Sequence, residues 1–394
     1  MRRRHFLKLL PSSLLLTACQ APPASALRVT ALKGSLPNLF PRQFHQAFPQ
    51  IEPIALTQSR QLSELFQQLQ AWKRRSDANF QPRKGLVPFN VPWIGTAPEV
   101  PIADLASLGD FWLPIAIRQG LIQPIDAGQI PAWATIDPKL QAIAKRNDRG
   151  EPDPNGKLWG IPYRINSTVL LYRKDLFKQA KLAPPTDWAD LWRSDLTGKI
   201  SLLNSPTEII ALTLKKLGKS ANETTLPPEL RPELMQLQPQ AKLYSSTHYL
   251  QPLTLDHTWL AVANSADALA MMRRNPNLVA VFPKSGALLN ADLWVQPTLA
   301  SRDDRSQSLA ETIATWCNYC LSPAIAAQFS QLSQGIAPSL LQSDAQQFPE
   351  ELRNNPILNP DRAVFAKSEF LAPKRSADLD EVRLIWEKLR KNEL

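Results

Sequence analysis

The chain has 394 residues, of which 44% are hydrophobic, and its formal net charge is +10. Four of these ten charges come from Arg2, Arg3, Arg4 and Lys8, and the others are scattered without a basic stripe interleaved with aromatic residues, which excludes a nucleic-acid-binding protein. Only 13 glycines are present and no G-x-G-x-x-G or Walker pattern occurs, which excludes a phosphate-cradling nucleotide loop.

The first twenty residues have the pattern of an export signal. A basic head is followed by the apolar stretch Leu9–Leu16, which is too short to cross a bilayer as a helix. Leu16-Thr17-Ala18-Cys19 resembles a bacterial lipobox, and the basic head resembles a twin-arginine export pattern. We expect residues 1–18 to be an export signal, Cys19 to carry lipid and residues 19–26 to form a tether.

The segment that follows alternates between strand and helix patterns. Residues 27–32 read as a strand, and residues 40–48 and 62–72 have helical spacing. Residues 79–101 are rich in proline and show little periodicity, which indicates a surface loop or an insertion. Residues 104–120 then predict a short strand, a glycine turn and a helix.

The same alternation continues to residue 332. It predicts strands and helices that together indicate an α/β fold with mostly parallel sheets. The predicted elements are a β-rich segment over 158–173, a short helix at 187–192 capped by Thr186 or Asp187, a strand at 199–203, a helix at 206–217, strands at 255–264 and 278–282 with a helix between them, and a long helix over 309–332.

The remaining cysteines, Cys317 and Cys320, form a C-x-x-C inside an apolar helical stretch. No second C-x-x-C exists and no strand precedes this one, so buried core residues are favoured over a disulfide or a redox site. The histidines at 45, 248 and 257 are too dispersed to form a metal site. No two tyrosines are adjacent, which argues against an iron site built from a tyrosine pair. No metal site is therefore predicted. We also find no H-E-x-x-H, nucleophile elbow or Ser-His-Asp spacing.

Several stretches resemble the solute-binding proteins of bacterial ABC importers, specifically the spermidine/putrescine-binding group. The stretches are RQGLIQPID, WGIPYRINSTVLLYRKDLF, TDWADLWRSDLTGKISLLNSPTEIIALTLKKLG and VFPKSGALLNADLWVQP. The resemblance covers most of residues 27–340. It implies a type II periplasmic binding protein fold, in which two α/β lobes joined by crossing hinge strands enclose a ligand. The first lobe would comprise residues 27–168 and 292–340, and the second residues 169–291 and 341–394. The hinge would lie near Thr168–Leu171 and Ala291–Asp292.

The resemblance also carries individual ligand positions. Glu208 and Asp292 match acids that grip amines, and Gly109-Asp110-Phe111 matches a small-polar-aromatic trio. A polyamine would need such carboxylates for its ammonium groups and aromatic faces for its methylenes. Each residue also has a structural interpretation. Glu208 could stabilise the start of a helix through its charge, and Asp292 could be a turn residue. Asp110 could cap a helix and Phe111 could pack in the core.

Other positions depart from the family pattern. Ser205 replaces an acid, aromatic rings are absent at Asn290 and near Ala263, and the first loop has Lys33 and Ser35 where the family places aromatic residues. A cleft that has gained cations and lost an acid relative to the family pattern would suit a shorter amine, a zwitterion or a carboxylate better than a long polycation. Tyr163 and Arg164 lie in the strand that leads to the predicted hinge, and we add them to the candidates. The predicted ligand residues are Lys33, Ser35, Asp110, Phe111, Tyr163, Arg164, Glu208 and Asp292.

The resemblance predicts a monomeric receptor in the periplasm that captures a small polar solute and delivers it to an ABC permease. A polyamine such as spermidine or putrescine is the favoured ligand, and a zwitterion or carboxylate is the alternative. A sensor or assembly lipoprotein on the same fold is a further alternative, and an enzyme is not predicted. We expect no cofactor, and membrane contact only through lipid on Cys19.

Overall fold

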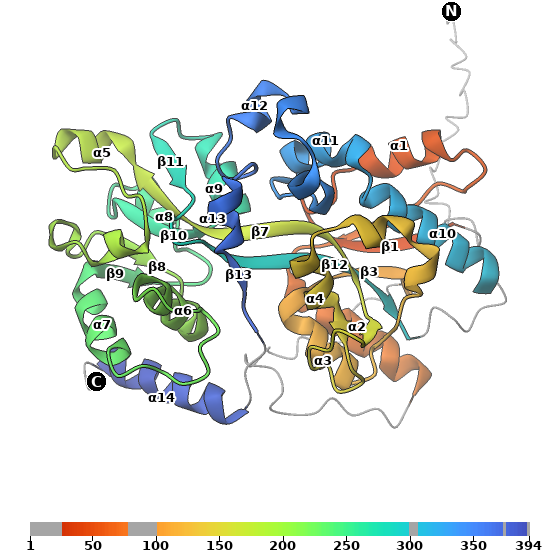
Figure 1. The fold of residues 1–394 in the computed structure, drawn as a ribbon, viewed down its shortest axis with the longest axis horizontal. Coiled ribbons are helices and arrows are strands. Elements are labelled where there is room, and N and C mark those ends of the chain that lie inside the picture. The colour runs from red at the N-terminus through yellow and green to blue at the C-terminus, as the bar shows by residue number, and fades with distance from the viewer. Residues whose placement is uncertain (1–25, 78–100, 299–305, 373–375, 392–394) are drawn as a thin grey trace, which may run out of the picture.

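The computed structural model describes residues 26–77, 101–298, 306–372 and 376–391. The predicted signal, Cys19, the tether up to residue 25 and nearly all of the predicted loop at 79–101 lie outside this part of the chain. The central sheet has the strand order β2-β1-β3-β12-β7-β10-β8-β9. Figure 1 shows two masses of helices, with β7 (Ile161–Arg173) and β12 (Leu288–Pro297) running between them.

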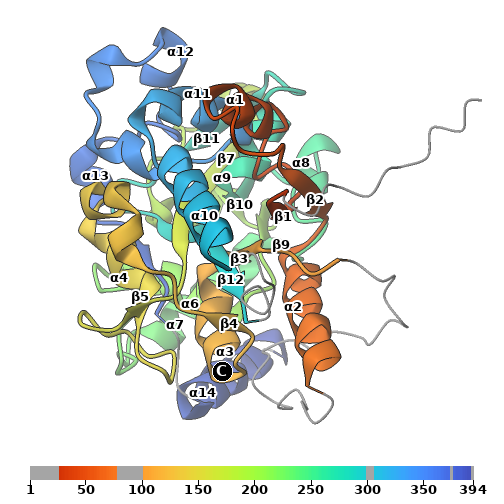
Figure 2. The same cartoon turned by 90° about the vertical axis from the view of Figure 1, so that its right-hand side faces the viewer.

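The first wing is the half of the sheet formed by β2, β1, β3, β12 and the start of β7. In it β1 pairs in parallel with β2 and β3, whereas β12 pairs antiparallel with β3 and β7. Figure 2 looks onto this wing. Its further elements are β1 (Arg28–Leu32), α1 (Leu39–Ala47), β2 (Ala55–Ser59), α2 (Leu62–Ser76), β3 (Leu105–Gly109), α3 (Leu113–Arg118), β4 (Ile122–Gln123), α4 (Pro138–Ala144), β5 (Lys145–Arg146), β6 (Lys157–Leu158), α10 (Ser306–Cys320) and α11 (Pro323–Ser333).

The second wing is formed by the end of β7 with β10, β8, β9 and β11. Here β8 pairs in parallel with β9 and β10, and β7 pairs antiparallel with β10 and β11. Its elements are α5 (Lys174–Gln179), β8 (Ile200–Leu202), α6 (Pro206–Lys216), α7 (Leu230–Leu237), β9 (Ala241–Tyr244), α8 (Gln251–Thr254), β10 (Leu260–Asn264), α9 (Ser265–Met272), β11 (Leu278–Val281) and α14 (Ser376–Lys391).

Three segments connect the wings. Strand β7 changes partner between Ser167, which faces Leu289 of β12, and Thr168, which faces Asn264 of β10. The chain returns between β11 and β12, and Leu288 still packs in the core of the second wing. The third segment is β13 (Glu369–Phe370), which pairs in parallel with the first residues of β12. It follows α12 (Glu350–Arg353) and α13 (Arg362–Ala366).

The C-terminal residues contribute to two hydrophobic clusters. Phe348, Leu352 and Phe365 belong to the larger cluster, which contains β1 and β3 and also residues of β10, α9 and β11. Val382 and Leu389 of α14 pack with α6 and α7 in the cluster of the second wing. The lobe boundaries predicted from the sequence stay a prediction.

The predicted α/β class is confirmed, with two differences in detail. The expected long helix at 309–332 is two helices, because Pro323 lacks an N–H and disfavours a helical conformation for the residue before it. Ser322 caps the second helix by accepting a bond from the Ala324 N–H. The strand expected from residue 255 begins only at Leu260, after α8 and Asp256, whose φ is 60°.

Aromatic side chains fill the core of the first wing. The ring of Trp294 on β12 stacks on Tyr163 of β7, with 4.0 Å between centroids, and lies 6.1 Å from Trp316 of α10. Cys317 and Cys320 are buried beside these rings as free thiols, and burial raises the pKa of Cys317 to about 12. Their interpretation as core residues agrees with this packing, because a protonated buried thiol is a poor nucleophile.

Candidate ligand-binding site

A cavity of about 770 Å³ lies between the wings, at the carboxyl ends of their parallel strands. On the first wing it is lined by Lys33, Arg60 and Asp110, which follow β1, β2 and β3. On the second wing it is lined by Ser205 and Asp267, which come after β8 and β10. Open α/β sheets bind ligands outside the carboxyl ends of their strands, so this cavity is the candidate ligand site.

Four carboxylates line the cavity. Asp292 forms an ion pair with Arg164, with 2.9 Å between Oδ2 and the guanidinium nitrogen. Asp110, Glu208 and Asp267 form no ion pair within the residues that the structure describes. The cations Lys33 and Arg60 are exposed, whereas Arg164 is buried and already neutralised. Three acids of the cavity are therefore left without a cationic partner among the described residues.

The structure brings together six of the eight residues predicted from the sequence. These six line the cavity from both wings and from the crossing strands, and they are Lys33, Asp110, Phe111, Arg164, Glu208 and Asp292. The two others, Ser35 and Tyr163, do not line it.

Tyr163 and Ser35 belong to the core beneath the cavity. The Tyr163 hydroxyl lies 2.7 Å from Ser35 Oγ and 2.8 Å from Ser107 Oγ, so its hydrogen-bonding needs are met inside the protein. Both side chains are fully buried, so the structure does not place them on the cavity wall with the six other predicted residues. The reason is the period of two in a strand. Arg164 and Asn166 line the cavity, whereas Tyr163 faces the core between β7 and α10.

The second wing presents two acids through the same local pattern. Ser205 and Glu208 follow β8, whereas Asn264 is the last residue of β10 and Asp267 comes three residues after it. In each case the acid lies in the first turn of a helix, where the helix dipole favours a carboxylate. Sequence reasoning identified Glu208 but missed Asp267. The matching signal, a polar cap followed three residues later by an acid, could have located it.

Tyr249 orients Asp267 and was also missed from the sequence. Its hydroxyl donates a hydrogen bond to Asp267 Oδ2 at 2.7 Å, and the tyrosine is buried in the cavity wall. Burial raises the pKa of the neighbouring Glu208 carboxyl, which is the direction expected for an acid that lacks a cationic partner. The two acids thus form a negative end of the cavity on the second wing.

Asp110 and Phe111 form the opposite end, on the first wing. Asp110 Oδ1 accepts a hydrogen bond from the Ala291 N–H at 3.1 Å. The pKa of Asp110 is raised to about 7, chiefly by burial and also by the negative charge of Asp292, while the hydrogen bond from Ala291 and the charge of Arg146 act in the opposite direction. Phe111 is 42% exposed although it is a large apolar residue. An exposed ring on the cavity wall offers a face for methylene groups or a cation.

The raised pKa of Asp110 predicts a pH-dependent stability. Between about pH 4 and pH 7 the folded protein keeps a proton that the unfolded chain releases, so stability should fall as pH rises through this window. The slope from this group is at most about 1.4 kcal/mol per pH unit. We expect denaturant titrations at pH 5, 6 and 7 to show a flatter profile for Asp110→Asn than for the parent. Equal slopes would contradict the assignment, since the other buried acids are shared.

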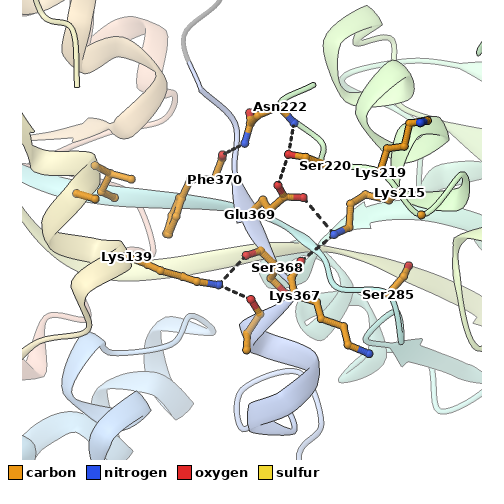
Figure 3. A pocket seen from close by; sticks show the side chains of 14 residues that line it. Lys139, Lys215, Lys219, Ser220, Asn222, Ser285, Lys367, Ser368, Glu369 and Phe370 are labelled. Carbon is orange, nitrogen blue, oxygen red and sulfur yellow. Dashed lines mark hydrogen bonds and ion pairs between the residues drawn. The ribbon is translucent and has the colours of Figure 1, made fainter. Parts of the chain in front are cut away.

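A second cavity of about 730 Å³ lies on the other side of β13. Glu369 and Phe370 line it, whereas the next residue, Leu371, lines the first cavity. Figure 3 shows Lys139 of α4 and Lys215 of α6 reaching the segment at 366–369 from opposite sides. Lys139 Nζ donates to the carbonyls of 366 and 368, and Lys215 Nζ donates to the carbonyl of 367 and to Glu369. These contacts hold the connecting strand to both wings.

The chain belongs to the bacterial extracellular solute-binding protein family, whose family model matches residues 95–360. It is 25% identical over 308 residues to the putrescine-binding periplasmic protein PotF of Escherichia coli, covering 73% of this chain and 78% of that protein. It is 24% identical over 271 residues to the spermidine/putrescine-binding periplasmic protein of Salmonella typhimurium, covering 68% and 72%.

The fold is shared with solved structures of transporter receptors. The spermidine/putrescine substrate-binding protein PotD of Streptococcus pneumoniae superposes with a TM-score of 0.73 at 17% identity, over 94% of this chain and all of that one. These relatives are binding proteins and not enzymes. Among the described residues there is no helix that is both long and apolar enough to cross a membrane, and no group of three potential metal ligands.

Proposed function

We propose that this protein is the extracytoplasmic receptor of an ABC importer and captures a small polyamine between its two wings. The observation that carries the proposal is the set of three carboxylates, Asp110, Glu208 and Asp267, which lie around the cavity and form no ion pair within the described residues. Asp110 is buried, Glu208 is half-buried and Asp267 is exposed. Closure of the wings would remove all three from water, where carboxylates are costly without cationic partners, and the ammonium groups of a polyamine would supply those partners. The relatives, which are putrescine-binding and spermidine/putrescine-binding proteins, support the same ligand class.

The distribution of the acids favours a ligand with charges at both ends. Asp110 stands on the first wing, and Glu208 and Asp267 stand on the second. A dication would therefore bridge the wings, with Phe111 beside its methylene groups. A zwitterion or a carboxylate is the second candidate, because the exposed cations Lys33 and Arg60 also line the cavity.

Closure of the wings is the proposed mechanism of capture. The hinge would comprise the point in β7 between Ser167 and Thr168, the entry to β12 near Leu288, and β13. This places the second crossing before the predicted Ala291–Asp292. In this division residues 345–366 move with the first wing and α14 with the second. Ligand shifts the population towards the closed form through its higher affinity for that form.

Location and partner follow from the same role. A receptor of this kind works in the periplasm and docks on an ABC permease in the cytoplasmic membrane, as a monomer. Lipid on Cys19 would keep it at the membrane surface, since acyl chains anchor a protein without a spanning helix.

The test is a thermal-shift screen of the mature protein with Cys19 replaced. The panel contains putrescine, spermidine, spermine, amino acids, quaternary amines, thiamine and small carboxylates. A ligand at one hundred times its Kd should add about 2.7 kcal/mol of stability. We expect stabilisation by a polyamine that is lost in Asp267→Asn. Stabilisation only by carboxylates would support the second candidate, and no response to any compound would overturn a receptor for these solutes.

A further inference from the structure

We infer that Arg164 is a specificity-determining residue. Its guanidinium pairs with Asp292 at the point of the cavity wall where a ligand ammonium would otherwise do so. The protein therefore selects a diamine over a longer polyamine. This inference rests on the proposed function and narrows its ligand. Among the described residues, Asp292 is the one of the four cavity carboxylates that forms an ion pair with a protein side chain.

The pair is built into the wall of the cavity. Arg164 on β7 lies directly opposite Asp292 on β12, and the register of the two strands shifts immediately afterwards, between Asp292 and Leu293. Opposed residues of neighbouring strands project on the same face, so both side chains lie on the cavity side of the sheet. The side chains are 7% and 3% exposed.

Arg164 is held in this position by close packing. A Cβ at Gly335 would lie 2.5 Å from Arg164 Cγ and 2.6 Å from its Nε, so only glycine leaves room for the arginine side chain. Guanidinium groups stay protonated in proteins. Asp292 therefore faces a fixed, permanent cation, whereas Lys33 and Arg60 are exposed side chains that can move away from a ligand.

The position of the acids gives the selectivity. With Asp292 neutralised, the carboxylates left for a ligand are Asp110 on one wing and Glu208 and Asp267 on the other. Two ammonium groups suit these two ends, one beside Asp110 and one shared by Glu208 and Asp267. A third ammonium, as in spermidine, would compete with the Arg164 guanidinium for Asp292 and would be repelled by it. Removal of Arg164 would free one more carboxylate beside Asp110.

The experiment measures affinities for putrescine and spermidine by calorimetry in the parent and in Arg164→Gln. We expect the parent to prefer putrescine and the variant to shift the ratio of the two affinities towards spermidine by at least tenfold. Arg164→Met fills the space against Gly335 with an apolar side chain, and it serves as the second variant if glutamine prevents folding. The shift is expected in both.

Two controls separate this effect from a general change in charge. Arg60→Gln removes an exposed, screened cation from the same cavity, and it should change the ratio of the two affinities by far less than tenfold. In Arg164→Gln/Asp292→Asn no carboxylate is freed, so the ratio should remain that of the parent. A ratio unchanged within twofold in Arg164→Gln and Arg164→Met overturns the inference and leaves the proposed function intact. Absence of binding of either amine to the parent overturns both.

Discussion

Replacement of Asp292 by alanine should lower the free energy of unfolding by about 3–5 kcal/mol, because it leaves the buried Arg164 without its partner. Arginine cannot lose its proton to escape this cost. Arg164→Gln should cost less, since burial already raises the pKa of Asp292 and the carboxyl can protonate. Denaturant titration of the two single variants at neutral pH measures this asymmetry.

The double variant Arg164→Met/Asp292→Leu is the matched control for the Asp292 prediction. Replacing both members of a buried ion pair with apolar residues is often neutral for stability, so this protein should unfold near the midpoint of the parent. If Asp292→Ala instead unfolds at the same denaturant concentration as the parent, the ion pair is not buried in solution as the structure places it.

Asp267→Asn should weaken diamine binding by at least about thirtyfold while leaving stability almost unchanged. Asp267 is exposed in the structure, and closure of the wings around a ligand would bury its charge pair with an ammonium group. Losing the carboxylate of such a pair costs about 2 kcal/mol or more, and 2 kcal/mol is a factor of about 30 in affinity. Asp267 makes no ion pair within the described chain, so its removal leaves no protein cation unpaired. Calorimetry with putrescine gives the affinity, and thermal melting without ligand gives the stability.

Tyr249→Phe and Asp148→Asn are the controls for Asp267. Tyr249→Phe removes the hydroxyl that donates to Asp267, and it should weaken binding by a smaller factor because the carboxylate remains. Asp148 is an exposed acid paired with Lys157 outside the cavity, and its replacement should change affinity by less than twofold. An Asp267→Asn protein that binds putrescine as the parent does would remove Asp267 from the site.

Local patterns in the sequence were sufficient to predict many of the elements that carry the site. The strand at residues 28–32, the helix at 206–216 and the Asp187 cap of the turn Trp188–Trp192 follow from hydrophobic periodicity and capping chemistry, which involve only near neighbours in the chain. The resemblance to polyamine-binding proteins then indicated Glu208 and Asp292. Glu208 lies in the first turn of α6, and Asp292 lies within β12.

Contacts between distant segments decided whether each candidate residue lines the cavity and whether its charge is paired. Arg164 and Asp292 are 128 positions apart, and their pairing follows from the register of β7 against β12, which no local pattern specifies. The same register places Tyr163 on the core face next to Trp294, although it adjoins Arg164 in sequence. Residue type and local spacing determined the elements and the family, because those depend on neighbours within one turn or strand. Strand pairing decided which side chains meet in the cavity and which acids keep a free charge, because these depend on distances between segments far apart in the chain.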